Sequence, residues 1–187
     1  MASFVLAQTE FSADIVDHGK EKNVMTKLYS GHDKLRFDSP GKDGGVIMDL
    51  KGENYIVLMP QQHMYMTMSA NDMENRNAFH FFQTGDVDNA CAEWLAMATN
   101  KGGSCKKDGS EMVNGRTTVK YEGTNAKGEG SKVWLDSKLR FPIKWESKDG
   151  GGELQNIHEG PQSASLFEIP AGFSKMDMGA MMQHKHN

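Results

Sequence analysis

Apolar and polar residues alternate along much of the chain, in short segments that are separated by turn-forming residues. The segments GVIMDL, NYIVLM and HMYMTM, at residues 45–50, 54–59 and 63–68, show this pattern clearly. A period of two is typical of strands that bury one face. Turn signals such as SGHD, KGEN and VNGR recur about every eight to twelve residues. Together these features predict a mainly β fold, an antiparallel sheet of about nine or ten strands.

One stretch, DVDNACAEWLAMATN, departs from this pattern. Val87, Cys91 and Leu95 are spaced near the helical period, so we expect a helix with Asp86 or Asp88 at its N-cap. The preceding stretch NDMENRNAFHFFQ is a candidate for a second, shorter helix. A sheet of this size must curl. We therefore predict an α+β half-barrel with a helical insertion over its concave face.

The alternation also predicts an apolar groove on that concave face. Met64, Met66 and Met68 occupy alternate positions of one segment, and Ile143 and Trp145 do so in FPIKWES. Alternate residues of a strand point to the same face. The predicted lining of the groove is Met48, Met64, Met66, Met68, Ile143 and Trp145.

Composition and charge narrow the function classes. Hydrophobic residues make up 37% and charged residues 25% of the 187 residues, which is typical of a globular protein. The length fits one domain, which we expect at residues 8–175. No apolar run approaches the ~20 residues of a membrane-spanning helix. The formal net charge is −4, without a basic stripe, so nucleic acid is not an expected partner.

The first seven residues, MASFVLA, bear on export. Val5 and Ala7 have the small-x-small spacing that precedes a signal peptidase site. Residues 1–7 are therefore a candidate remnant of an export signal. An ordinary apolar first strand is the alternative interpretation.

The two cysteines, Cys91 and Cys105, bear on the compartment. The intervening residues, AEWLAMATNKGGS, provide neither C-x-x-C spacing nor a basic cluster that would make either cysteine reactive. Closing their loop of about fifteen residues would stabilise the fold by roughly 3 kcal/mol. We predict a structural disulfide in a periplasmic or otherwise exported protein.

The sequence contains no recognisable catalytic motif. There is no G-x-S-x-G elbow, and the seven histidines are scattered along the chain. The glycine-rich stretches GKDGG and DGGG lack the Lys-Ser/Thr and the helix of a phosphate-binding loop. We therefore expect a protein that is not an enzyme and has no cofactor.

Methionine is unusually abundant, with fourteen residues. Thioether and imidazole ligands suit Cu(I). Alternate methionines of one strand are about 6.6 Å apart, too far for one ion, which favours an apolar lining. Residues 176–187 form a separate Met/His-rich tail, for which copper binding is an alternative to a solvated end. The candidate ligands of the tail are Met176, Met178, Met181, Met182, His184 and His186.

Two motifs carry a resemblance to a known group. Residues 134–145 have the pattern W-x-D-x-x-x-x-x-P-I-K-W, and residues 167–173 read FEIPAGF. With their flanks, over about residues 105–180, they resemble an uncharacterised family of exported bacterial proteins related to the LolA/LolB-type periplasmic lipoprotein carriers. The resemblance implies a strongly curved antiparallel half-barrel that is closed by helices over a hydrophobic cavity.

Three functions remain open at this point. The first is an exported protein that binds a lipid or acyl chain in the apolar groove. The second is an envelope protein-interaction module with a filled core, whose partner is another protein. Copper binding through the tail is the third alternative.

Overall fold

The computed structural model describes residues 9–18, 25–38, 44–50, 54–69, 84–97, 100–148 and 150–176. Its centre is one sheet of twelve strands in the order β12-β6-β5-β4-β3-β2-β1-β11-β10-β9-β8-β7. The strands are β1 (Phe11–Asp17), β2 (Met25–Gly31), β3 (Lys34–Asp38), β4 (Gly45–Asp49), β5 (Asn54–Met59), β6 (Met64–Ser69), β7 (Ser104–Val113), β8 (Arg116–Thr124), β9 (Gly130–Asp136), β10 (Phe141–Ser147), β11 (Gly150–Glu159) and β12 (Ser174–Lys175).

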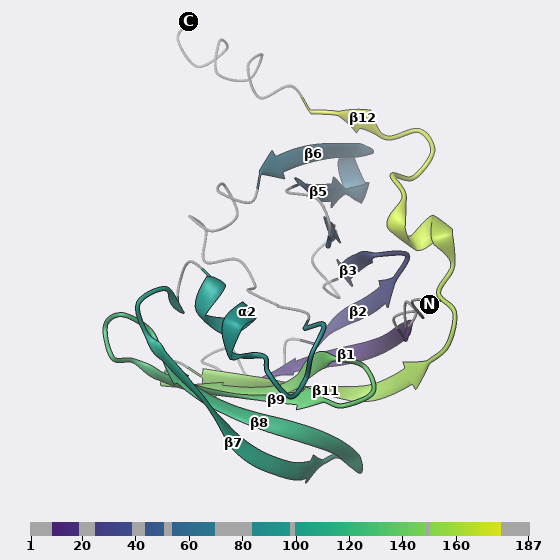
Figure 1. Ribbon diagram of the computed structural model, residues 1–187. Coiled ribbons are helices and arrows are strands. Elements are labelled where there is room, and N and C mark those ends of the chain that lie inside the picture. The colour runs from purple at the N-terminus through teal and green to yellow at the C-terminus, as the bar shows by residue number, and fades with distance from the viewer. Residues whose placement is uncertain are drawn as a thin grey trace, which may run out of the picture.

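The sheet consists of two antiparallel meanders, β1–β6 and β7–β11, that are joined where β1 pairs with β11. Figure 1 shows that the sheet curves strongly, with helix α2 (Cys91–Ala96) on its inner side. The predicted fold class, a curved half-barrel with a helix on the concave face, is confirmed. Among the described residues, no helix is long and apolar enough to span a membrane.

The sheet has twelve strands where we predicted nine or ten, and its two edge strands, β7 and β12, show no apolar alternation. β1 alternates as expected, with Phe11, Ala13 and Ile15 buried, and its pattern was readable in the sequence. β7 is exposed at almost every position, so it has no apolar alternation to detect. β12 contains only two residues and is defined by backbone pairing with β6.

The strand registers define which side chains share the concave face. Leu28 pairs with Phe37, Phe37 with Val46, Val46 with Val57, and Val57 with Met66. Directly opposite residues of neighbouring strands lie on the same face. The concave face is therefore apolar from β2 across to β6.

Two buried clusters hold the sheet together. The larger one contains side chains from β1–β4 and β9–β11, including the fully buried Phe11 and Phe141, whose ring centroids are 5.5 Å apart. The smaller one packs Val87, Ala90 and Trp94 of the helical region against the concave sides of β8 and β9. The helical insertion thus covers one end of the curved sheet.

Helix α2 is shorter than the sequence pattern predicted, and its N-cap differs. It covers Cys91–Ala96, and its N-cap is Ala90, without a side-chain hydrogen bond. Asp86 instead stabilises the preceding turn by accepting hydrogen bonds from the Asp88 backbone (2.9 Å) and the Asn89 side chain (2.6 Å). The expected second helix, at residues 71–83, lies outside the described residues.

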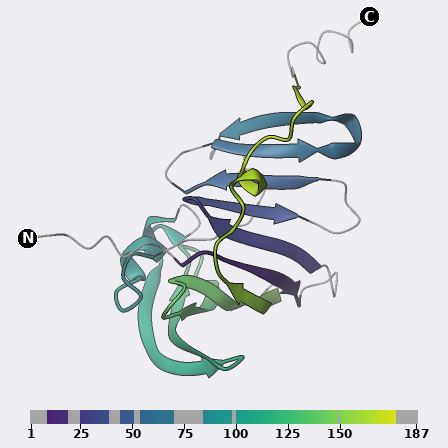
Figure 2. The same cartoon turned by 90° about the vertical axis from the view of Figure 1, so that its right-hand side faces the viewer.

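A C-terminal segment, residues 160–176, crosses the convex face and is called the strap below (Figure 2, yellow). Phe167, at the end of the 3₁₀ turn η3 (Ala164–Phe167), is buried to 2% exposure and lies against the ring of His32. Lys34 Nζ and Arg36 Nη1 donate hydrogen bonds to the carbonyls of Phe167 and Leu166, at 3.2 and 2.8 Å. The strap then joins the sheet as β12.

Candidate functional site

The concave side of β4–β6 carries a continuous apolar surface, which we call the methionine face. Its members are apolar, half-buried and linked by direct cross-strand pairing. They are Val46, Tyr55, Val57, Met59, Met64, Met66 and Met68. Because each side chain is only half-buried, this face can contact a further apolar group.

The predicted groove residues fall into two separate groups. Met64, Met66 and Met68 are together on β6 and half-buried, as members of the methionine face. Ile143 and Trp145 are on β10, separated from β6 by six strands in the sheet order. Ile143 is fully buried in the larger cluster, where Met48 also lies at 8% exposure. Ile143 and Met48 are therefore core residues in this structure.

The members of the methionine face that the predicted lining lacks include three residues of β5, namely Tyr55, Val57 and Met59. Their alternation was visible in NYIVLM. Their position opposite Met68, Met66 and Met64 depends on the register of the β5–β6 hairpin. That register is set by a turn, Pro60–Gln62 followed by a residue with positive φ, which simple turn signals do not identify.

Residues 87–96, which contain helix α2, cover the other end of the concave face, and we call them the helical lid. Tyr121 of β8 binds the backbone of the lid. Its hydroxyl donates to the carbonyl of Val87 (2.8 Å) and accepts from the N–H of Ala90 (3.2 Å). The disulfide between Cys91 and Cys105 joins α2 to β7. The lid region is therefore attached to β8 and β7 by both polar and covalent contacts.

Residues 134–145, the first of the two motifs that carry the resemblance, connect neighbouring strands of the sheet. The ring of Trp134 lies between two ammonium groups, Lys144 Nζ at 4.3 Å and Lys120 Nζ at 5.6 Å from its centroid. Its indole N–H donates to Glu111 on β7. Trp134 and Lys144 of the motif thus tie neighbouring strands together through cation–π contacts and a hydrogen bond.

Asp136 of the same motif organises the turn between β9 and β10. Its carboxylate accepts hydrogen bonds from the N–H groups of Lys138 (2.8 Å) and Leu139 (2.7 Å). It also pairs with Arg116, and this contact raises the pKa of the guanidinium. Asp136 is buried and fully engaged, so the motif maintains the fold rather than a reactive site.

The second motif, FEIPAGF, lies within the strap. Phe167 is its buried anchor, and the ring of Phe173 lies 5.9 Å from that of His63. Gly172 has a φ of 83°, a conformation that favours glycine at this turn. The motif therefore marks the path of the strap across the convex face.

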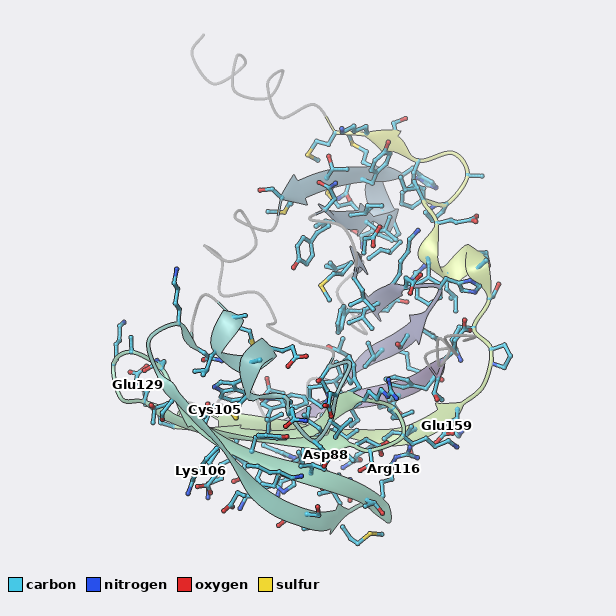
Figure 3. All side chains as sticks on the ribbon, in the orientation of Figure 1. Asp88, Cys105, Lys106, Arg116, Glu129 and Glu159 are labelled. Atoms are coloured by element: carbon cyan, nitrogen blue, oxygen red, sulfur yellow. A yellow bond between two sulfur atoms is a disulfide. The ribbon has the colours of Figure 1, made fainter. Side chains whose placement is uncertain are left out.

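Two open cavities lie away from the methionine face. One, of about 570 Å³, is at the ends of β7–β10 and is lined by charged and hydroxyl side chains, among them Lys106, Glu122 and Lys132. Figure 3 shows Lys106 on the outer side of the sheet. Hydrogen bonds from Lys132 and Lys106 lower the pKa of Glu122 to about 2. The second cavity, of about 530 Å³, lies beside the start of the strap.

The candidate metal ligands of the tail are only partly described. Met176 lies in the described residues, directly after β12. Met178, Met181, Met182, His184 and His186 lie outside them. The part of the chain that the structure describes contains no group of three or more His, Cys, Asp and Glu side chains that could bind a metal ion.

Comparison by sequence finds no matching family model and no matching curated protein. Comparison by structure finds similar folds. An uncharacterized conserved protein from Thermus thermophilus has a TM-score of 0.56 at 10% identity, over 90% of each chain. MucB of Pseudomonas aeruginosa, solved with MucA, has a TM-score of 0.53 at 14% identity, over 88% of this chain and 57% of that chain.

PNGF-II has a TM-score of 0.52 at 11% identity, over 95% of this chain and 33% of that chain. This chain thus spans about a third of PNGF-II and just over half of MucB. A LolA superfamily protein, NE2245 from Nitrosomonas europaea, also matches, at a TM-score of 0.37 that is too low to support an argument. At these identities the likeness to the Thermus thermophilus protein, MucB and PNGF-II is one of fold alone.

Proposed function

We propose that this is an exported, non-enzymatic protein that binds an apolar ligand, a lipid or acyl chain, on the methionine face. The observation that carries the proposal is the continuous row of half-buried apolar side chains on the concave side of β4–β6. Contiguous exposed apolar surface is characteristic of binding sites. Methionine suits such a surface, because its flexible thioether adapts to ligands of irregular shape.

Export is supported by the disulfide. Cys91 and Cys105 are bonded, with a Cα–Cα distance of 5.5 Å, and the structure describes no free cysteine. Structural disulfides persist in oxidising compartments and are rare in the cytosol. The periplasm or another exported location is therefore the compartment that we propose.

The test begins with protein purified from its own host. Lipid extraction followed by mass spectrometry should recover a long-chain ligand, and a fluorescent fatty acid should bind the delipidated protein. Met66→Lys should weaken fatty-acid binding at least tenfold, because it introduces a charge among apolar side chains. Met66→Leu, which keeps the face apolar, should bind as the wild type does.

Met112→Lys is the matched control, since Met112 is 63% exposed at the far end of the sheet. It should leave fatty-acid binding unchanged, and circular dichroism should show that all three variants are folded. If no long-chain ligand co-purifies and none binds the delipidated protein, the proposal is wrong.

A second candidate function is the binding of an envelope protein by the same face. It is favoured by one observation, that MucB, a neighbour in fold, was solved in complex with MucA. A photo-crosslinking amino acid at position 66 distinguishes the two in the host. A product heavier by the mass of a protein supports this candidate, whereas a product heavier by the mass of a lipid supports the first.

A further inference from the structure

Strand β12 brings a methionine of the C-terminal segment to the edge of the methionine face. β12 runs parallel to β6, with Ser174 beside Met64 and Lys175 beside Tyr65. The N–H of Met176 donates to the carbonyl of Tyr65 at 2.7 Å, which continues the ladder by one residue. The register therefore places Met176 beside Met66, on the same face as Met64 and Met66.

A further methionine reaches the same place from the other side. Met59, the last residue of β5, is directly opposite Met64, the first residue of β6. Two neighbouring strands, β5 and β6, and the residue directly after β12 thus contribute thioethers to one patch. We call this patch, Met59, Met64, Met66 and Met176, the methionine quartet. All four side chains are half-buried.

The spacing of the quartet permits the four sulfur atoms to converge. Residues directly opposite on neighbouring strands have Cβ atoms about 4.5–5.5 Å apart, and adjacent strands are about 4.8 Å apart. A methionine side chain has three rotatable bonds, so its sulfur can move toward a common centre. Met64 and Met66 remain about 6.6 Å apart along β6. A shared ion therefore requires their side chains to bend toward a centre between them, where Met59 and Met176 supply the sulfurs from the two sides of β6.

We propose that the methionine quartet binds a soft monovalent cation, Cu(I), at the edge of the sheet. Thioethers are neutral, soft ligands that select Cu(I) over hard divalent ions. His63, the residue before β6, is not part of the site, because its side chain is exposed and its ring lies against that of Phe173. The site is a sulfur-only one, and it differs from a Met/His site in the tail.

The test uses the full chain and Cu(I) itself, in competition with a chromophoric Cu(I) chelator under anaerobic conditions. Met64→Leu and Met176→Leu should each weaken Cu(I) binding at least tenfold, because each removes one sulfur while keeping an apolar side chain of similar volume. Met112→Leu is the matched control and should bind Cu(I) as the wild type does. X-ray absorption of the loaded protein should show sulfur ligands only.

Two results would overturn the proposal. One is Cu(I) affinity that is unchanged in the Met64→Leu/Met176→Leu double variant. The other is loss of Cu(I) binding by a folded chain that ends at residue 176, because the ligands would then lie in the tail. Fatty-acid binding should persist in Met176→Leu, because Met176 is not a member of the methionine face, so failure of the metal site can be distinguished from failure of the proposed function.

Discussion

Cys91 of helix α2 and Cys105 of strand β7 are bonded across a sequence separation of 14 residues, and this bond attaches the helical lid to the last strand of the sheet. Replacing both cysteines by alanine should lower the free energy of unfolding by about 3 kcal/mol, through the greater entropy of the unfolded chain. For a domain of this size that corresponds to a Tm lower by roughly 6–12 °C. Calorimetry of the oxidised wild type, the reduced wild type and the double variant measures the effect. The last two should agree, and free thiols in protein purified from the envelope would contradict the assignment.

The strap depends on one buried side chain, Phe167, at 2% exposure. Phe167→Ala should lower the free energy of unfolding by about 3–5 kcal/mol, the usual result of removing a fully buried aromatic side chain. Ile169→Ala, two residues along and 36% exposed, should change it by no more than about 0.5 kcal/mol. Urea unfolding curves of both variants test this. Equal midpoints for the two would show that the strap contributes little to stability.

Gly152 has no room for a side chain, because Trp145 of the neighbouring strand lies over it. A Cβ there would lie in contact with the Trp145 ring and 2.8 Å from the carbonyl of Val16. Gly152→Ala should therefore destabilise the fold by about 1–3 kcal/mol and change the fluorescence of Trp145. Gly130→Ala is the control, since a Cβ there meets nothing within 4 Å. Unchanged stability of Gly152→Ala would mean that Trp145 can move away.

Glu122 should make stability depend on acid pH. Hydrogen bonds from Lys132 and Lys106 lower its pKa from 4.5 to about 2, so the folded state binds the proton less well than the unfolded state does. Its stabilising effect is then complete above about pH 5 and is lost as the pH falls through about 2. Relative to Glu122→Gln, the wild type should have the higher urea midpoint at pH 6, with the difference disappearing near pH 2. Added salt should reduce this difference in urea midpoint at pH 6. A difference independent of pH would exclude ionisation as its cause.

Much of the fold could be read from the sequence. The period of two in GVIMDL, NYIVLM and HMYMTM predicted strands β4, β5 and β6, because a strand that buries one face must alternate. The pairing of Cys91 with Cys105 followed from their being the only two cysteines. The strands β7 and β12 could not be predicted in this way, because β7 is exposed on both faces and β12 exists only through its backbone contacts with β6.

The tertiary structure decided which of the alternating apolar residues form the methionine face. Alternation assigns a side chain to a face of its strand, but only register and sheet order decide which strands are neighbours. Met48, Ile143 and Met66 have the same local pattern, yet the first two became buried core residues and Met66 stayed half-exposed on the sixth strand. Met59 and Met176, which are 117 positions apart in the numbering, flank β6 only because a hairpin brings one there and the strap brings the other. Local periodicity carries no information on such long-range pairing, which depends on how the whole sheet curls and closes.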